Sequence, residues 1–126
     1  MDTGKDRREE VRYPIASVYR KYILCKLLGK GATHTETEIL DFSMHGIKIK
    51  SPVYAPQDSE IDCVISLPKL YQKDMRAKLK VVYSTPVENS RNFILGAKII
   101  DPDNNYITRV YAKIIEFVAS RAGDIF

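Results

Sequence analysis

The residues of this chain with the clearest capacity for ligand chemistry lie in two short clusters. Arg7, Arg8 and Arg12 form a basic cluster near the start. Residues 41–46, Asp-Phe-Ser-Met-His-Gly, place a carboxylate, a hydroxyl and a glycine where the chain turns between two strand-like segments. Guanidinium groups bind anions through charge-assisted hydrogen bonds, and a carboxylate accepts such bonds. Together the two clusters indicate a site for a large anionic ligand.

Each cluster also has a purely structural interpretation. Arg8 and Arg12 share one side of a helical turn, or lie roughly 13 Å apart in an extended arm, so both can reach one ligand in either geometry. The alternating charges of residues 7–12 would also suit a solvated tail with weak local ion pairs. Asp41, Ser43 and Gly46 would equally suit a hairpin turn held by side-chain hydrogen bonds.

Composition indicates one soluble globular domain. The chain has 126 residues, of which 44% are hydrophobic and 29% are charged. The net charge of +4 suits an anionic partner but is too small to predict nucleic-acid binding. The apolar runs are shorter than a membrane-spanning helix, and residues 1–10 lack the apolar core of a signal peptide. We therefore predict a cytoplasmic protein that does not insert into membranes.

The sequence predicts neither a metal site nor a catalytic site. The spacing of Cys25 and Cys63 matches neither a zinc site nor a disulfide framework, so we interpret them as buried thiols. His34 and His45 have no Cys, His or acidic partner at metal-ligand spacing. No pair of nucleophile and base is recognisable, so we expect no metal, no cofactor and no enzymatic activity.

Alternation of apolar and polar residues predicts an all-β domain. Six segments are typical of strands, and polar or proline-containing connections, including residues 68–76, separate them. The predicted strands cover residues 18–28, 35–42, 47–51, 61–67, 77–83 and 92–100. Short loops and outward-facing lysines favour a six-stranded antiparallel β-barrel, because closure removes exposed sheet edges.

A helix and an arm complete the predicted domain. From residue 101, apolar residues recur at spacings of three and four, which predicts an amphipathic helix over about 101–122. Asp101 suits the N-cap and Pro102 the first helical position. The polar residues 1–12 are expected to form a flexible arm, and residues 13–126 the barrel with its helix.

The motifs and the expected fold resemble the PilZ family of cyclic di-GMP-binding domains. Arg8 and Arg12 have the form Arg-x-x-x-Arg just before the first predicted strand. Asp41, Ser43 and Gly46 have the form Asp-x-Ser-x-x-Gly at the junction of the second and third predicted strands. The order and placement of both motifs carry the resemblance.

The resemblance extends from residue 7 to about residue 117, nearly the whole chain. Gly96 supports it, because it stands in the last strand at a place where the family often has glycine. The implied ligand, cyclic di-GMP, presents two guanines and two phosphates.

The resemblance also implies roles for individual residues. Arg8 and Arg12 would contact guanine and phosphate, because a guanidinium fork fits both the O6/N7 edge and phosphate oxygens. Asp41 would accept hydrogen bonds from the N–H edge of guanine. Ser43 would hydrogen-bond the ligand or the backbone of the turn, and Gly46 would permit the turn or a close approach of the ligand to the backbone.

Arg7 stands directly before the motif, where an arginine resembles the arrangement associated with a stacked dimer of cyclic di-GMP. Its guanidinium group could stack on an exposed guanine face. The same arginines would also suit a mixed guanine–adenine ring, so the sequence leaves the choice between related cyclic dinucleotides open.

Two functions from different classes remain. The first is a bacterial second-messenger receptor, whose arm folds over the barrel when ligand binds and thereby signals to a protein partner in motility, polysaccharide export or transcription. The second is a small-barrel module that binds protein or single-stranded nucleic acid. The alternating lysines at 48, 50, 78 and 80 are more typical of an outer barrel face than of a nucleic-acid-binding surface. This pattern favours the receptor over the nucleic-acid-binding module. The effector and the oligomeric state, a homodimer included, stay open.

Overall fold

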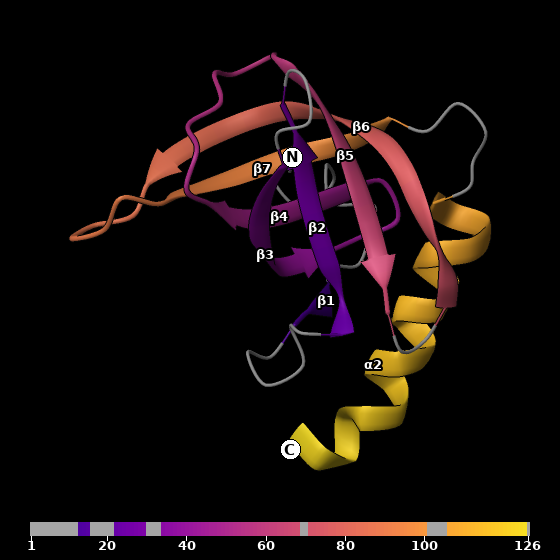
Figure 1. Cartoon of the computed structure of the whole chain (residues 1–126). Helices are drawn as coiled ribbons and strands as arrows, with labels where there is room; N and C mark the ends of the chain where they lie inside the picture. The colour runs from indigo at the N-terminus through magenta and orange to yellow at the C-terminus, as the bar shows by residue number, and fades with distance from the viewer. Residues whose placement is uncertain (1–12, 16–21, 30–33, 69–70, 101–105, 126) are drawn as a thin grey trace, which may run out of the picture.

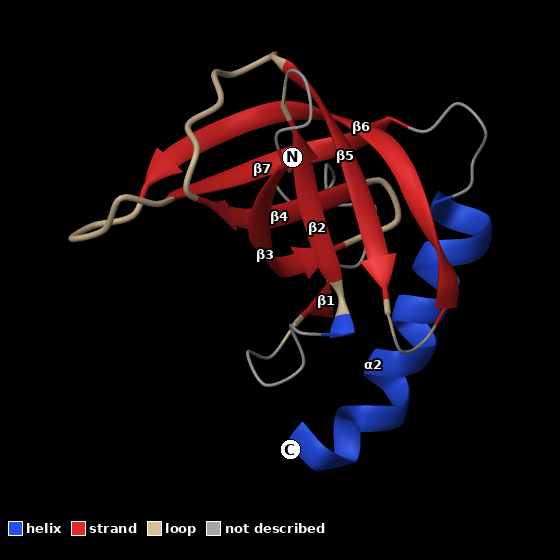
Figure 2. Ribbon diagram, viewed as in Figure 1, coloured by secondary structure: helices blue, strands red, loops and turns tan. Residues whose placement is uncertain are grey.

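The fold is a closed antiparallel β-barrel followed by a helix at the C-terminal end of the chain (Figure 1 and Figure 2). The computed structural model describes residues 13–15, 22–29, 34–68, 71–100 and 106–125. The strands are β1 (Tyr13–Pro14), β2 (Leu24–Leu28), β3 (His34–Phe42), β4 (Gly46–Ser51), β5 (Glu60–Leu67), β6 (Tyr71–Pro86) and β7 (Phe93–Ile100). Strands β2 to β7 form a ring in the order β3-β2-β5-β6-β7-β4, which closes because β4 also pairs with β3. The predicted six-stranded antiparallel barrel is confirmed.

Alternation of apolar and polar residues explains why the strands face as they do. In β4, Ile47 and Ile49 are buried in the core, whereas Lys48 and Lys50 between them stay partly exposed on the outer face. Successive side chains of a strand point to opposite faces, so each strand contributes every second residue to the core. Burial of each large aliphatic side chain contributes about 1.5–3 kcal/mol.

The C-terminal helix covers part of the barrel with one apolar face. A π-helical segment, η2 (Tyr106–Tyr111), leads into α2 (Ala112–Ile125). The buried residues of this helix recur at spacings of three and four and belong to the same core as the barrel; they are Tyr106, Val110, Ile114 and Phe117. Phe117 packs against Tyr22, with the ring centroids 5.6 Å apart.

The helix continues to Ile125, beyond the end expected near residue 122. Asp101 and Pro102, which we expected to start the helix, lie outside the described residues. In the parts of the chain that the structure describes, no helix is both long and apolar enough to span a bilayer.

Two predicted segments differ from the structure. The prediction of a polar connection over residues 68–76 is wrong from Tyr71 onward, because β6 begins there and pairs with β5. The alternation of apolar and polar residues in this segment was missed because its exposed residues are charged. Met75 is buried, whereas Asp74 and Arg76 are exposed on the outer face. Conversely, β2 begins at Leu24, and Tyr22 before it packs against Phe117 of the helix. Residues 18–21, which we also expected in this strand, lie outside the described residues.

The short strand β1 was not predicted. Tyr13 pairs with Phe42 and Pro14 with Asp41, and Ile15 N–H donates to the Leu40 carbonyl at 2.9 Å. Strand β1 therefore places the start of the barrel domain beside the last residues of β3. The predicted arm, residues 1–12, lies outside the described residues.

Cys25 and Cys63 are free, buried thiols on the neighbouring strands β2 and β5. A hydrogen bond with Cys25 and burial raise the pKa of the Cys63 thiol well above its ordinary value. Cys63 therefore stays protonated in the folded state at pH values where an exposed thiol ionises.

This raised pKa predicts a loss of stability at alkaline pH. Below about pH 8 the Cys63 thiol is protonated in both states; as pH rises further, only the unfolded state loses this proton, so the contribution of Cys63 to the free energy of unfolding falls by up to about 1.4 kcal/mol per pH unit. Urea unfolding between pH 7.5 and 10, with reductant, measures this slope. The Cys63→Ala variant should show a shallower slope, and identical slopes in both proteins would refute the prediction.

Candidate functional site

The Asp-x-Ser-x-x-Gly motif forms the turn between β3 and β4, which we call the motif turn (residues 43–46). Ser43 N–H donates to the Gly46 carbonyl at 2.8 Å, and the buried Ser43 hydroxyl approaches the same carbonyl at 3.5 Å. Ile99 N–H donates to the His45 carbonyl at 2.8 Å, which ties the turn to β7. Backbone bonds to two strands therefore fix the shape of the motif turn, and the Ser43 side chain supports it from inside.

The inner side of the motif turn packs on the C-terminal helix. The Tyr106 hydroxyl donates to the Ser43 carbonyl at 3.1 Å. Phe42, which is fully buried, packs edge-on against Tyr111 with ring centroids 5.8 Å apart. The turn is thus connected to η2 by a hydrogen bond and an aromatic contact, so a displacement of the turn would be transmitted to the helix.

Removal of the Tyr106 hydroxyl should measure this connection. In Tyr106→Phe the buried Ser43 carbonyl loses a donor while the aromatic packing is kept, so we expect the free energy of unfolding to fall by about 1–2 kcal/mol. Urea unfolding measures the change. The matched control is Tyr54→Phe, which removes an exposed hydroxyl, keeps the ring contact with Phe93 and should unfold as wild type. A stability equal to wild type in Tyr106→Phe would show that the bond is dispensable.

Asp41 lies on the outer face, one residue before the buried Phe42. Its carboxylate pairs with the Lys48 ammonium group at 3.3 Å across β3 and β4, and its side chain is 14% exposed. A β-bulge between Ile39 and Asp41 inserts Leu40 into the ladder, and bulges of this kind re-aim side chains. The Asp41 carboxylate is therefore held at the surface beside the motif turn.

The predicted basic cluster precedes Tyr13, the first residue that the structure describes. Arg7, Arg8 and Arg12 lie outside the described residues. Tyr13, the residue after Arg12 in the sequence, pairs with Phe42 between Asp41 and Ser43. Of the predicted site residues, the structure thus brings Asp41, Ser43 and Gly46 together.

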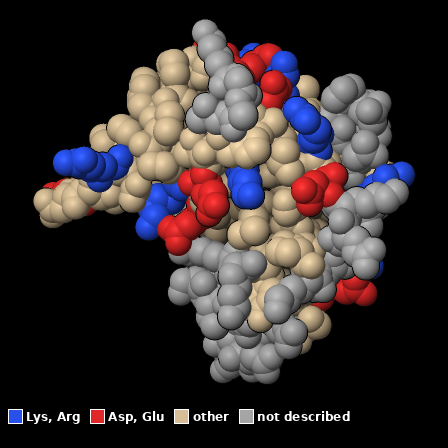
Figure 3. Space-filling view, in the orientation of Figure 1, with Lys and Arg blue, Asp and Glu red and all other residues tan. Residues whose placement is uncertain are grey.

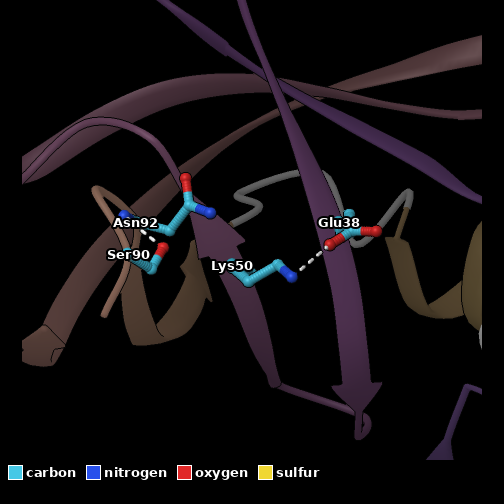
Figure 4. Close-up of polar contacts among 4 residues, drawn as sticks. All are labelled: Glu38, Lys50, Ser90 and Asn92. Carbon is cyan, nitrogen blue, oxygen red and sulfur yellow. Dashed lines mark hydrogen bonds and ion pairs between the residues drawn. The ribbon is translucent and has the colours of Figure 1, made fainter. Parts of the chain in front are cut away.

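Lys50 and Glu38 form a second ion pair along the same two strands, at 3.0 Å (Figure 4). Positive and negative side chains also lie next to one another on the face seen in Figure 3. Lys78 likewise approaches Glu60 and Asp62 at 3.9 and 3.8 Å. These partners agree with the interpretation of the lysines as an outer barrel face.

Sequence reasoning missed the residues that strand pairing brings to the motif turn. Lys48 pairs with Gly96 on β7, and Gly96 pairs with Tyr83 on β6; Lys98 pairs with Gly46 itself. Alternation places Lys98 and Tyr83 on the outer face, but no local signal gives the register of β7 against β4. Among the described residues, no group of three or more His, Cys, Asp or Glu side chains could hold a metal ion.

A small closed barrel with a turn-forming Asp-x-Ser-x-x-Gly motif and a C-terminal helix defines the class of this domain. The sequence model of the PilZ domain matches residues 6–119, and the chain therefore belongs to the PilZ domain family. A comparison with curated protein sequences found no match.

Solved structures share this fold at low sequence identity. MrkH of K. pneumoniae, in complex with c-di-GMP, is 14% identical with a TM-score of 0.69, over 91% of this chain and 55% of MrkH. The PilZ domain of YcgR from Escherichia coli, with c-di-GMP, is 11% identical with a TM-score of 0.66, over 94% of this chain and 95% of that domain. The Bacillus subtilis inhibitor of motility MotI is 14% identical with a TM-score of 0.61, over 91% of this chain and 53% of MotI. The chain spans about half of MrkH and MotI, and the likeness concerns the fold.

Proposed function

We propose that this protein is a cytoplasmic receptor for cyclic di-GMP and not an enzyme. One observation carries the proposal: β1 pairs with the end of β3, so the residue after the Arg-x-x-x-Arg motif lies beside the Asp-x-Ser-x-x-Gly motif. The described position of Tyr13 beside Phe42 therefore supports a common site for the two motifs. Membership of the PilZ family supports the ligand, as do the c-di-GMP complexes of MrkH and YcgR.

The proposed contacts follow from the chemistry of the ligand. The Asp41 carboxylate accepts hydrogen bonds from the N1–H and N2–H groups of one guanine. Arg8 and Arg12 bind phosphate and the O6/N7 edge of guanine through their guanidinium forks. Gly46 lets the ligand approach the backbone, and Ser43 holds the motif turn in shape.

Arg7 extends the site to a second ligand molecule. Its guanidinium group stacks on the outer guanine of a cyclic di-GMP dimer. We therefore expect two ligands per chain in wild type and one in Arg7→Ala. One ligand per chain in saturated wild type would refute the dimer and leave the receptor function intact.

Binding is relayed to an effector protein. Ligand contacts fold the arm over the motif turn and so change the surface offered to a partner. The connection from Ser43 to Tyr106 supplies a second route, because the motif turn rests on the helix. Motility, polysaccharide export and transcription are the candidate outputs.

Isothermal titration with cyclic di-GMP tests the proposal, with Asp41→Asn as the key variant. The amide keeps the size of Asp41 but removes the charge that accepts the guanine N–H groups, so we expect roughly 10- to 100-fold weaker binding. The matched control is Glu38→Gln, which breaks the equivalent ion pair with Lys50 and should bind as wild type. No binding by the intact protein would overturn the receptor function and favour a protein- or nucleic-acid-binding module.

A further inference from the structure

The π-helical segment η2 begins and ends with a tyrosine, and both tyrosines support the motif turn. Tyr106 is 1% exposed, and its hydroxyl donates to the Ser43 carbonyl at 3.1 Å. Tyr111 packs edge-on against Phe42, the residue directly before the turn. The two tyrosine rings also contact each other, with centroids 6.1 Å apart and planes inclined by 43°. The motif turn therefore rests on a pair of tyrosines five positions apart.

The π-helical winding of η2 explains how this pair arises. In an α-helix each residue advances by about 100° around the axis, so residues five apart point about 140° away from each other. In a π-helix the hydrogen bonds join residues five apart and bring them to nearly the same side. The six residues of η2 run from Tyr106 to Tyr111, so the unusual winding covers the stretch between the two rings.

The remainder of the helix is held against the barrel. Val110, Ile114 and Phe117 are buried in the core at the spacings of four and three that an α-helix produces. If η2 changed to α winding while these residues stayed in place, the rotation of about 100° would fall on Tyr106 and carry its hydroxyl away from Ser43. π-Helical segments are rare and occur frequently at functional sites.

We propose that the π-helical winding of η2 is a positioning element of the ligand site, which keeps Tyr106 and Tyr111 on the motif turn and links ligand affinity to the helix. This inference rests on the proposed function, because it assigns a support to the same cyclic di-GMP site. A ligand that prefers the motif turn in the shape held by Tyr106 also favours the π winding. Linkage is reciprocal, so η2 stabilises the complex by the same free energy by which the ligand stabilises η2.

Two substitutions release the motif turn from η2. Tyr106→Phe removes the hydrogen bond to Ser43, and we expect about fivefold weaker binding of cyclic di-GMP in isothermal titration. Tyr111→Leu removes the ring contacts with Phe42 and Tyr106 and should weaken binding to a similar extent. The matched control is Tyr54→Leu, which also removes one ring of an edge-on pair. Tyr54 follows the end of β4, whereas the motif turn precedes its start, so this variant should bind as wild type.

Deletion of Thr108, an exposed residue within η2, tests the winding itself. The deletion leaves Tyr111 four positions after Tyr106, and residues four apart share one face of an ordinary α-helix. Both tyrosines then keep their places without π winding, so the affinity should stay within about threefold of wild type. The matched control is Thr108→Ala, which removes the side chain but keeps the length of the segment.

Hydrogen exchange provides a readout that a merely structural role would not change. Saturating cyclic di-GMP should slow amide exchange over residues 106–111 by about fivefold in wild type and in Thr108→Ala, the same factor by which Tyr106→Phe weakens binding. After deletion of Thr108 the ligand should slow this exchange by less than about twofold, because α winding no longer depends on the turn.

The outcomes separate this inference from the proposed function. Wild type that binds, with Asp41→Asn weakened but Tyr106→Phe unchanged in affinity, would overturn the positioning role and leave the receptor intact. Equal slowing of exchange in wild type and in the deletion variant would likewise overturn the role of the winding. Wild type that fails to bind would overturn both proposals. Thermal unfolding verifies that each variant is folded, and if the deletion variant is not, the two tyrosine substitutions decide the result.

Discussion

Replacement of Phe42 by alanine is expected to lower the free energy of unfolding by about 3–5 kcal/mol. Phe42 is 0% exposed and lies between Asp41 and Ser43, so its ring anchors the motif from inside the barrel. It packs edge-on against Tyr111 of η2, and its backbone pairs with β1 and β4. Truncation would leave a cavity at the point where three elements meet.

Urea unfolding of Phe42→Ala measures the loss, and Tyr54→Ala provides the matched control. Tyr54 also makes an edge-on aromatic contact, with Phe93 at 5.5 Å, but it is 56% exposed. Its loss should therefore lower the free energy of unfolding by less than about 1 kcal/mol. A cost for Phe42→Ala no larger than that of Tyr54→Ala would mean that the motif turn does not depend on its buried anchor.

The same substitution should weaken cyclic di-GMP binding, even though the Phe42 side chain is buried away from the outer face. Asp41 and Ser43 flank Phe42 in the sequence, so a cavity at 42 loosens both positions. We expect this coupling because a ligand site depends on the packing that supports it.

Local sequence patterns were sufficient to predict the central strands and the motif turn. Alternation over residues 35–42 and 47–51 gave β3 and β4 nearly to the residue. The outward side of Asp41 and the inward side of Phe42 depend on the bulge at Leu40, because strict alternation from the buried Ile39 would reverse them. Residues 71–76 of β6 escaped prediction because the exposed positions 74 and 76 are charged and residue 68 is proline. Strand β1 escaped because its two residues carry no periodic signal.

The pairing register between strands could not be predicted from local sequence patterns. Gly96 could be noted as a family-like glycine, but the reason for it, the ring of Tyr83, depends on the pairing of β6 with β7 and on a bulge. Lys98 could be placed on the outer face, yet its position opposite Gly46 depends on the pairing of β7 with β4. The pairing of β7 with β4 joins residues about fifty positions apart, whereas Tyr83 and Gly96 lie on consecutive strands and depend on the bulge for their alignment.

The largest effect on function is expected from Arg8→Ala/Arg12→Ala, which should weaken cyclic di-GMP binding by at least 100-fold. A hydrogen bond to a charged group contributes about 1.5–3 kcal/mol, so the loss of two guanidinium groups corresponds to roughly 100-fold or more. Isothermal titration at 0.1 M salt measures the change. Stability should stay close to wild type, because both arginines precede β1, where the barrel domain begins.

A control variant with the same loss of charge separates overall electrostatic attraction of the ligand from specific contacts between the arginines and the ligand. Arg76→Ala/Arg91→Ala also lowers the net charge from +4 to +2, and both of these arginines are exposed. If binding depended on overall attraction alone, the two double variants would lose affinity equally, and the loss would vanish at 0.5 M salt. If the arginines before β1 contact the ligand, only Arg8→Ala/Arg12→Ala loses affinity, and the difference persists at high salt. That result would connect the part of the chain before β1 to Asp41 through the ligand, as the pairing of β1 with β3 leads us to expect.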